Sequence, residues 1–255
     1  MEKLKISIIT VVKNGMPFLI EAINSFDTQT YLNKEHIIVY SPSNDNTEEY
    51  LKNITNKVII KDGVSINKFG SLNIGIKKSK GDIIGILHAD DIFADNQILK
   101  NIVDFFEDTN SDIVYGNIKF CKKENINKII RTWQSSVFNR RNLKYGWMPP
   151  HTSIYIKRNI AKDNLYSTSF PISGDYQFIL NLFLNKNYLI NFLNKTVCIM
   201  RIGGDSTKLS TLIKKLKEDL QISKIKFKNY RLCIFLKIIR KIKQLHFFSS
   251  YNNLR

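Results

Sequence analysis

The alternation of strand and helix signals over the first 120 residues is the feature that most constrains the fold. Apolar runs predict five strands, at 5–12, 36–40, 58–60, 82–87 and 112–115. Helical patterns separate them, at 17–28, from Thr47 onward, at 66–79 and at 95–107. Near-continuous apolar strands joined by helices are typical of parallel sheets that are covered on both faces. The sequence therefore predicts an α/β fold with a doubly wound, mostly parallel central sheet and helices on both faces.

Two adjacent carboxylates, Asp90 and Asp91, follow the apolar strand 82–87 directly. Carboxylate oxygens are hard ligands that suit Mg²⁺ or Mn²⁺. The alternative interpretation is that Asp90, Asp91 or Asp95 caps the helix that begins near Asp95. In doubly wound sheets, ligands bind beyond the carboxyl ends of the strands. That rule selects the loops 13–15, 41–47 and 88–92, and because the pair falls in one of them, we favour a metal site over a helix cap.

Four segments in this order resemble the family 2 inverting glycosyltransferases of the GT-A fold. Within that family the resemblance is to the bacterial branch that builds capsule, exopolysaccharide and lipopolysaccharide O-chains. The segments are ISIITVVKN at 6–14, IIVYSPSNDNT at 37–47, GDIIGILHADD at 81–91 and SGDYQ at 173–177. Two shorter matches are MPPHT at 148–152 and MRIGGDS at 200–206. Together the matches span residues 5 to 206, which is most of the chain.

The resemblance implies a metal-dependent glycosyltransferase that works by a single displacement with inversion. The donor would be a nucleotide-diphosphate sugar, with a UDP-sugar favoured, and the acceptor a hydroxyl of a glycan or a lipid-linked glycan. Residues 1–207 would form the GT-A-like domain. Within it, 1–116 would be the nucleotide-sugar half and 117–207 the acceptor half.

The resemblance also implies roles for particular residues. Asp91 would hold Mn²⁺ or Mg²⁺, with Asp90 beside it on the donor, so that charge developing on the leaving diphosphate is stabilised. Asp175 would be the general base, and its other interpretation is a carboxylate at a helix start. His151 would lie on the acceptor side. The remaining donor contacts would be made by Thr10, Lys13, Tyr40, Ser43 and Asn73, of which Asn73 is equally well interpreted as a polar helix-face residue.

The chain departs from the family pattern at Tyr40, where the family usually carries an aspartate that reads the nucleotide base. Ser41-Pro42 also replaces a flexible pair of glycines. These changes leave nucleotide identity open and make a catalytically weakened homologue the first alternative. A sugar nucleotidyltransferase is the second, but it would need a glycine-rich basic phosphate loop after the first strand, and 11–15 fits that poorly.

The net charge of +17 is concentrated in residues 208–255, which carry thirteen lysines and arginines against Glu218 and Asp219. Between 224 and 248, basic and apolar residues recur at helical spacing. We therefore predict a basic amphipathic helical tail that lies on an anionic membrane surface. The alternatives are a helix packed on the domain and a dimer contact. No nucleic-acid partner is expected, because the tail contains no recognised binding module and the aspartate pair would repel phosphates.

Compartment signals indicate a cytoplasmic protein. The three cysteines are far apart and show no paired spacing, which favours reduced thiols. The first residues run straight into a strand without the pattern of a signal peptide. No apolar run approaches the ~20 residues that span a bilayer. Together with the basic tail, these signals predict a peripheral protein on the inner face of the plasma membrane.

Overall fold

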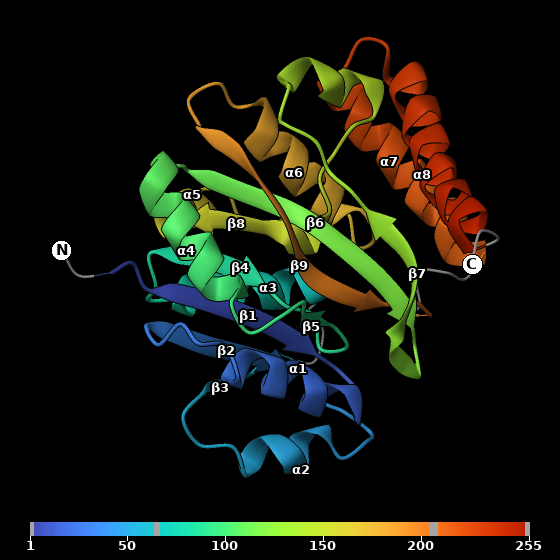
Figure 1. The fold of residues 1–255 in the computed structure, drawn as a ribbon. Coiled ribbons are helices and arrows are strands. Elements are labelled where there is room, and N and C mark those ends of the chain that lie inside the picture. Colours follow the sequence, from blue (N-terminus) through green and yellow to red (C-terminus); the bar gives the residue numbers. More distant parts are fainter. Residues whose placement is uncertain (1–2, 64–66, 204–208, 253–255) are drawn as a thin grey trace.

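Nine strands form one sheet in the computed structural model, which describes residues 3–63, 67–203 and 209–252 (Figure 1). The strands are β1 (Ile6–Val12), β2 (Lys34–Tyr40), β3 (Val58–Lys61), β4 (Ile83–Ile86), β5 (Ile92–Phe93), β6 (Ile113–Lys122), β7 (Asn125–Trp133), β8 (Ile154–Lys157) and β9 (Ile190–Arg201). The helices are α1 (Phe18–Asp27), α2 (Thr47–Lys52), α3 (Lys68–Lys78), α4 (Ile98–Thr109), η1 (Arg140–Tyr145), η2 (His151–Ser153), α5 (Arg158–Asp163), α6 (Gly174–Leu184), α7 (Leu209–Lys226) and α8 (Tyr230–Asn252).

The order along the sheet is β3-β2-β1-β4-β8-β6-β9-β5. Strand β7 lies outside this order and pairs with the later part of β6, from Ile118 onward. The first four strands are parallel to one another, which confirms the predicted α/β fold in the first half of the chain. In the second half the sheet is mixed, because β8 runs antiparallel to both β4 and β6, and β5 runs antiparallel to β9.

Two strand pairings place residues that are distant in sequence next to the carboxyl ends of the parallel strands. Strand β8 lies between β4 and β6, and its antiparallel direction puts the preceding turn η2 beside the end of β4. Strand β9 pairs with β5 so that Ile199 lies opposite Ile92. Because Asp91 precedes β5 and Arg201 ends β9, the two residues become neighbours.

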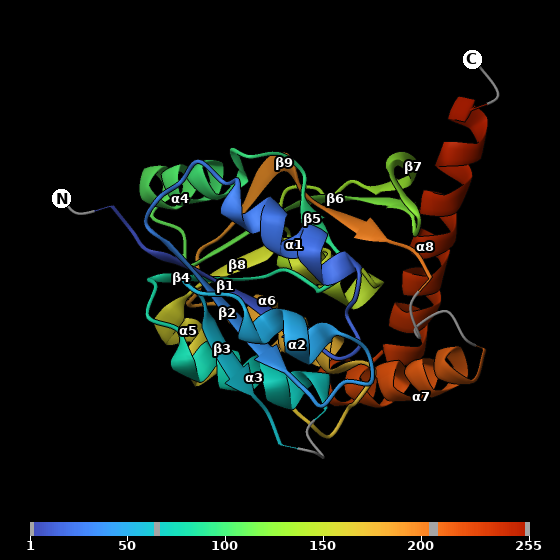
Figure 2. The same ribbon diagram turned by 90° about the horizontal axis from the view of Figure 1, so that it is seen from below.

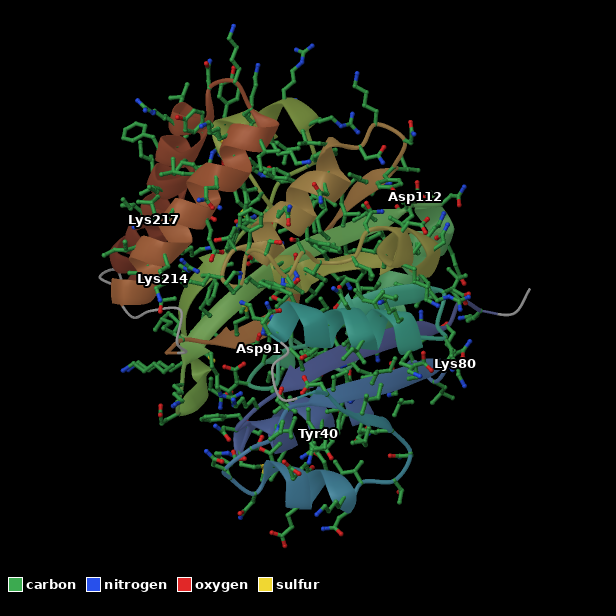
Figure 3. All side chains as sticks on the ribbon, turned by 180° about the vertical axis from the view of Figure 1, so that it is seen from behind. Tyr40, Lys80, Asp91, Asp112, Lys214 and Lys217 are labelled. Carbon is green, nitrogen blue, oxygen red and sulfur yellow. The ribbon has the colours of Figure 1, made fainter. Side chains whose placement is uncertain are left out.

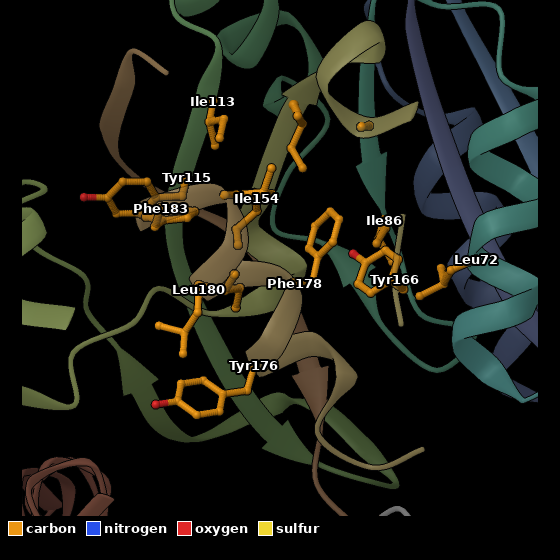
Figure 4. Close-up of a cluster of buried hydrophobic side chains, with 14 of the residues drawn as sticks. Leu72, Ile86, Ile113, Tyr115, Ile154, Tyr166, Tyr176, Phe178, Leu180 and Phe183 are labelled. Carbon is orange, nitrogen blue, oxygen red and sulfur yellow. The ribbon is translucent and has the colours of Figure 1, made fainter. Parts of the chain in front are cut away.

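Helices cover both faces of the sheet (Figure 2). Helices α3, α5 and α6 pack on one face around the larger apolar cluster, whereas α1 and α4 pack on the other. Figure 4 shows the larger cluster, in which the rings of Tyr115 and Phe183 lie 5.7 Å apart and those of Tyr166 and Phe178 stack at 3.8 Å. Each fully buried side chain of this size contributes about 1.5–3 kcal/mol of transfer free energy.

The basic C-terminal segment forms two helices that pack on the domain, which is one of the alternatives left open by the sequence. Helix α7 contacts α6 and α8, and α8 contacts η1 and β7. Ile222, Cys233 and Ile234 are buried in these contacts. The tyrosine hydroxyl of Tyr176 on α6 lies 2.9 Å from the hydroxyl of Ser223 on α7. Among the described residues, no helix is long and apolar enough to cross a membrane.

Gly146 sets how closely helix α8 approaches the domain. Its φ is +74°, and a Cβ at this position would lie 2.4 Å from the backbone nitrogen of Lys237. We expect Gly146→Ala to lower the free energy of unfolding by about 1–2 kcal/mol through the left-handed backbone alone, with a further loss because α8 must move. Urea unfolding measures this. A loss no larger than this backbone cost of about 1–2 kcal/mol would contradict the close approach.

Candidate active site

A cavity of about 780 Å³ opens beyond the carboxyl ends of β1 and β4. Its walls come from the loops 11–16 and 88–90, the start of α3, the turn η2, the start of α6 and the end of β9. Two of the three loops selected from the sequence line it. The third, 41–47, supports the wall from behind: the side chains of Ser43, Asp45 and Thr47 accept hydrogen bonds from the backbone of residues 14–16 at 2.9–3.0 Å.

His88, Asp90 and Asp91 form a cluster in which the ligand atoms lie within 4.8 Å of one another. Asp91 (labelled in Figure 3) is 1% exposed, and its Oδ1 accepts a hydrogen bond from the backbone nitrogen of Arg201 at 3.2 Å. Among the described residues its Oδ2 has no partner although it is buried. Burial, with the charge of Asp90, raises the pKa of Asp91 well above its usual range. An orphaned buried carboxylate oxygen beside a second carboxylate fits a divalent cation, which would satisfy the oxygen and offset the repulsion.

Arg201 fixes the position of this cluster. Its Nη1 donates to the carbonyl of Asp90 at 2.6 Å, its Nη2 pairs with Glu21 on α1 at 2.5 Å, and its Nε donates to the carbonyl of Lys123 at 3.0 Å. The guanidinium also lies 4.6 Å from the ring centre of Phe18. The side chain therefore ties the end of β9 to the carboxylate loop. The rest of the motif, 204–206, lies outside the described residues.

Asp175 lies in the first turn of α6, on the wall of the same cavity. The preceding Gly174 packs against Phe69, because a Cβ there would lie 2.7 Å from the ring. Burial alone would raise the pKa of Asp175, but the positive charges around it, with Lys215 the strongest, lower its pKa overall. Asp175 is therefore ionised at neutral pH and able to accept a proton.

Two imidazoles lie near the carboxylates. The ring centres of His88 and His151 are 6.2 Å apart, and Nε2 of His151 is 2.7 Å from the hydroxyl of Tyr166. Burial lowers the pKa of His151 to about 4 and also lowers that of His88, so both rings are neutral at pH 7. His151 lines the cavity and also has the internal hydrogen bond of a structural histidine, so its place on the acceptor side stays a prediction.

The structure places Thr10 and Asn73 away from the cavity. Thr10 is fully buried, and its hydroxyl donates to the carbonyl of Leu87 at 2.8 Å and lies 2.9 Å from Nε2 of His36. The amide of Asn73 bonds both backbone groups of Tyr166, each at 2.8 Å. Both side chains have structural partners and neither lines the cavity, so the donor contacts that the resemblance implies for Thr10 and Asn73 stay predictions.

The remaining predicted donor residues divide into two groups. Lys13 and Asp90 line the cavity. Tyr40 packs beside a separate apolar cluster around Val12. Ser43 accepts a hydrogen bond from the backbone nitrogen of Asn14. Neither residue lines the cavity.

Two polar groups near the site were not identified from the sequence. Asp62 follows β3 and is 7% exposed; its Oδ2 accepts hydrogen bonds from Ser41 and Ser71, whereas its Oδ1 has no partner among the described residues. Its position directly after strand β3 could have indicated a residue near the carboxyl ends of the parallel strands. Lys215 on α7 donates to the hydroxyl of Ser173 at 3.3 Å and lines the cavity. Nothing in its sequence surroundings distinguishes it from the other lysines of the tail.

A second cavity of about 700 Å³ adjoins the first and lies between the domain and the two tail helices. Trp133, Met148, Asp175 and Lys215 line both cavities. Asp175 is therefore the carboxylate that stands between them.

Comparisons with known proteins agree with this geometry. Residues 7–165 match the family model described as "Glycosyl transferase family 2". An uncharacterized glycosyltransferase of Haemophilus influenzae is 26% identical over 252 residues, which cover 96% of this chain and 94% of that protein. The glycosyltransferase GlyG of Streptococcus pneumoniae is 32% identical over 120 residues, covering 44% of this chain and 38% of that one.

Solved structures show the same fold. TarS of S. aureus, in complex with UDP-GlcNAc, has a TM-score of 0.68 at 17% identity and covers 86% of this chain. The mannosyltransferase PcManGT from Pyrobaculum calidifontis, in complex with GDP-Man and Mn²⁺, has a TM-score of 0.65 at 16% identity and covers 88%. This chain spans 66% of the crystallised TarS chain and 64% of PcManGT, and at these identities the likeness concerns the fold.

Proposed function

The chain belongs to glycosyl transferase family 2, and from that premise we propose that it transfers a sugar with inversion from a nucleotide-diphosphate donor to an acceptor hydroxyl, using a divalent cation. The observation that carries the proposal is the unpartnered buried oxygen of Asp91, which clusters with Asp90. Asp91 itself lies behind the wall, whereas Asp90 and the ionised Asp175 line the same cavity.

Asp91 and Asp90 would hold the cation and the donor diphosphate together. When bound, Mn²⁺ or Mg²⁺ would supply positive charge against the charge that develops on the leaving diphosphate. Arg201 holds the Asp90 backbone and Asp91 in place, so the carboxylates need no rearrangement. Lys13, exposed on the cavity wall, would approach the phosphates.

Asp175 would act as the general base in a single displacement. The acceptor oxygen forms a bond to the anomeric carbon as the bond from that carbon to the diphosphate breaks. The nucleoside diphosphate leaves with the bonding electrons, and the proton of the acceptor hydroxyl passes to the carboxylate of Asp175. Attack from the face opposite the leaving group inverts the anomeric configuration. The surrounding cations keep Asp175 ionised before the reaction.

A uridine nucleotide is the proposed donor. TarS was crystallised with UDP-GlcNAc, but PcManGT was crystallised with GDP-Man, so the choice rests mainly on the family resemblance. Tyr40 has no carboxylate to accept a hydrogen bond from a base N–H. The nearest substitute is Asp62, which bonds Ser41, the residue after Tyr40.

Turnover of the donor tests the function without knowledge of the acceptor, since water can replace the acceptor slowly. The protein with Mn²⁺ is incubated with a panel of UDP-, GDP-, CMP- and dTDP-sugars, and nucleotide release is followed together with the NMR signal of the freed sugar. An α-linked donor should give the β-anomer first. Inactivity with every donor would favour a catalytically weakened homologue. The reason to consider one is Tyr40, which replaces the aspartate that the family usually carries.

We further propose that the enzyme works at the inner face of the plasma membrane, in the synthesis of surface polysaccharide on a glycan or lipid-linked acceptor. The support is an apolar face on helix α8 that points away from the domain: Leu232, Phe235 and Ile242 are 45%, 60% and 47% exposed. Exposed arginines, Arg231 and Arg240, lie on the same helix. Exposed apolar residues with flanking cations suit the interface of an anionic bilayer.

Vesicle binding checks this placement. We expect the protein to sediment with vesicles that contain phosphatidylglycerol, and far less with phosphatidylcholine alone. Phe235→Gln should weaken binding about tenfold, because a large buried apolar side chain contributes about 1.5–3 kcal/mol. Leu32→Gln is the control, since Leu32 is 88% exposed and lies outside the tail. If Phe235→Gln and Leu32→Gln bind like the unchanged protein, the tail does not contact the membrane.

A further inference from the structure

The cavity between the domain and the two tail helices has apolar side chains on both of its walls. Helix α7 contributes Leu212 and Leu216 to its wall, and helix α8 contributes Ile234 and Ile238. The opposite wall includes two aromatic rings, those of Trp133 and Trp147. A cavity of about 700 Å³ that combines an apolar wall with placed polar groups is the usual form of a small-molecule site.

Positive charge exceeds negative charge in this cavity. Lys215, Lys237, Arg240 and Lys241 line it, and Asp219 is paired with Lys237 at 3.0 Å and with Lys215 at 3.6 Å. Within the described ranges, Lys241 has no carboxylate partner. Arg240 uses its Nε on the carbonyl of Tyr145 at 3.2 Å, which leaves its terminal nitrogens available. Burial and the nearby charges of Lys215 and Arg131 lower the pKa of Lys241. An anion would relieve this excess of positive charge.

The apolar wall of the cavity continues onto the outer surface. Leu212, Leu216 and Ile238 line the cavity and are still 42%, 41% and 43% exposed. Ile238 also stands one helical turn from Ile242, on the exposed face of α8. A long apolar group could therefore extend from the cavity along the tail. Asp175 lines the part of the cavity that adjoins the first cavity, because it borders both.

We propose that this cavity is the acceptor site and that the acceptor is a lipid phosphate carrying a sugar. Its phosphate would lie against Lys241 and Arg240, its apolar chain along the wall of α7 and α8, and its sugar hydroxyl at Asp175. The tail is then part of the active site as well as a membrane contact. Placing the sugar hydroxyl at Asp175 rests on the proposed function. The ligand class, a lipid phosphate, rests on the apolar and basic residues that line the cavity.

Intrinsic fluorescence tests the ligand class, because the two tryptophans of the chain, Trp133 and Trp147, both line the cavity. The probe is dodecyl phosphate below its micelle concentration, with dodecyl maltoside and inorganic phosphate as separate arms. We expect a saturable change with dodecyl phosphate and much weaker binding of the other two. Equal binding of the neutral detergent would overturn the phosphate contact, and equal binding of inorganic phosphate would overturn the lipid contact.

Matched variants locate the binding. Lys241→Glu should weaken dodecyl phosphate binding at least tenfold, because it replaces an attractive charge by a repulsive one. Lys217→Glu is the control, since Lys217 is exposed on α7 and does not line the cavity (Figure 3). Equal affinities for Lys241→Glu and Lys217→Glu would place the probe outside the cavity and overturn the proposal.

Nucleotide binding in the presence of Mn²⁺, measured on the same samples, separates this proposal from the proposed function. Nucleotide binding without binding of dodecyl phosphate would overturn the acceptor site and leave the transferase function intact. Binding of dodecyl phosphate without nucleotide binding would support the ligand class of the cavity and contradict the donor site.

Discussion

Asp175→Asn is expected to lose sugar transfer by roughly 10²–10⁴-fold, the usual contribution of a general base. Asparagine keeps the size of the side chain but cannot take a proton from the acceptor hydroxyl. The donor carboxylates Asp90 and Asp91 are untouched, so affinity for nucleotide with Mn²⁺ should stay within a few-fold. Initial rates of nucleotide release, with calorimetric titration of the nucleotide, measure the two quantities.

Asp108→Asn is the matched control for this variant, because Asp108 is exposed on helix α4 and lies outside the cavity. A general base gives a specific pattern, in which kcat falls while nucleotide affinity remains. If Asp175→Asn keeps its turnover, or loses turnover and nucleotide affinity together, Asp175 is not the base. A melting temperature close to that of the unchanged protein confirms that the helix start is intact.

Asp91→Asn is expected to have opposite effects on stability and on function. Without metal, Asp91 is a buried carboxylate that lacks a partner for Oδ2 and faces Asp90. Removing its charge should raise the melting temperature of the metal-free protein by a few degrees, since ~1 kcal/mol shifts it by about 2–4 °C at this size. The same change should abolish Mn²⁺-dependent nucleotide binding. Scanning calorimetry in EDTA and in Mn²⁺ measures both.

The pH dependence of stability follows from the same carboxylate. Because the pKa of Asp91 is raised in the folded protein, the folded state holds this proton more tightly than the unfolded chain. The contribution of Asp91 to stability is therefore present below its unfolded pKa and is lost as the pH rises through its folded pKa. Asp91→Asn should remove this decline in the metal-free protein. A metal-free Asp91→Asn variant that is less stable than the parent at pH 7 would show that Asp91 has a partner in solution.

Much of the parallel half of the sheet was predictable from the sequence because it follows local rules. Apolar runs locate the parallel strands, and parallel strands bring their carboxyl ends to one edge. Asp90 and Lys13 could be placed at the cavity on that basis, and Asp91 next to it. The surroundings of Thr10 and Asn73 could not be predicted, because the hydrogen bonds of their side chains involve Leu87 and Tyr166, which are distant in sequence.

The second half of the chain was less predictable because it depends on long-range packing. Strand β8 inserts antiparallel to β4 and so brings His151 beside His88. The local sequence pattern does not predict the direction of that strand. The docking of α8 depends on the close approach of Gly146 to Lys237, which lie far apart in the chain. The basic periodicity of the tail predicted an amphipathic helix, but it did not predict which face packs on the domain.

Calorimetric titration of a panel of nucleoside diphosphates, with Mn²⁺ and with EDTA, tests the donor site most directly. We expect that at least one nucleotide binds in Mn²⁺, that EDTA or Asp91→Asn removes the binding, and that Asp175→Asn preserves it. Absence of binding for every nucleotide, or equal binding in EDTA, would contradict a metal-dependent donor site at Asp90 and Asp91.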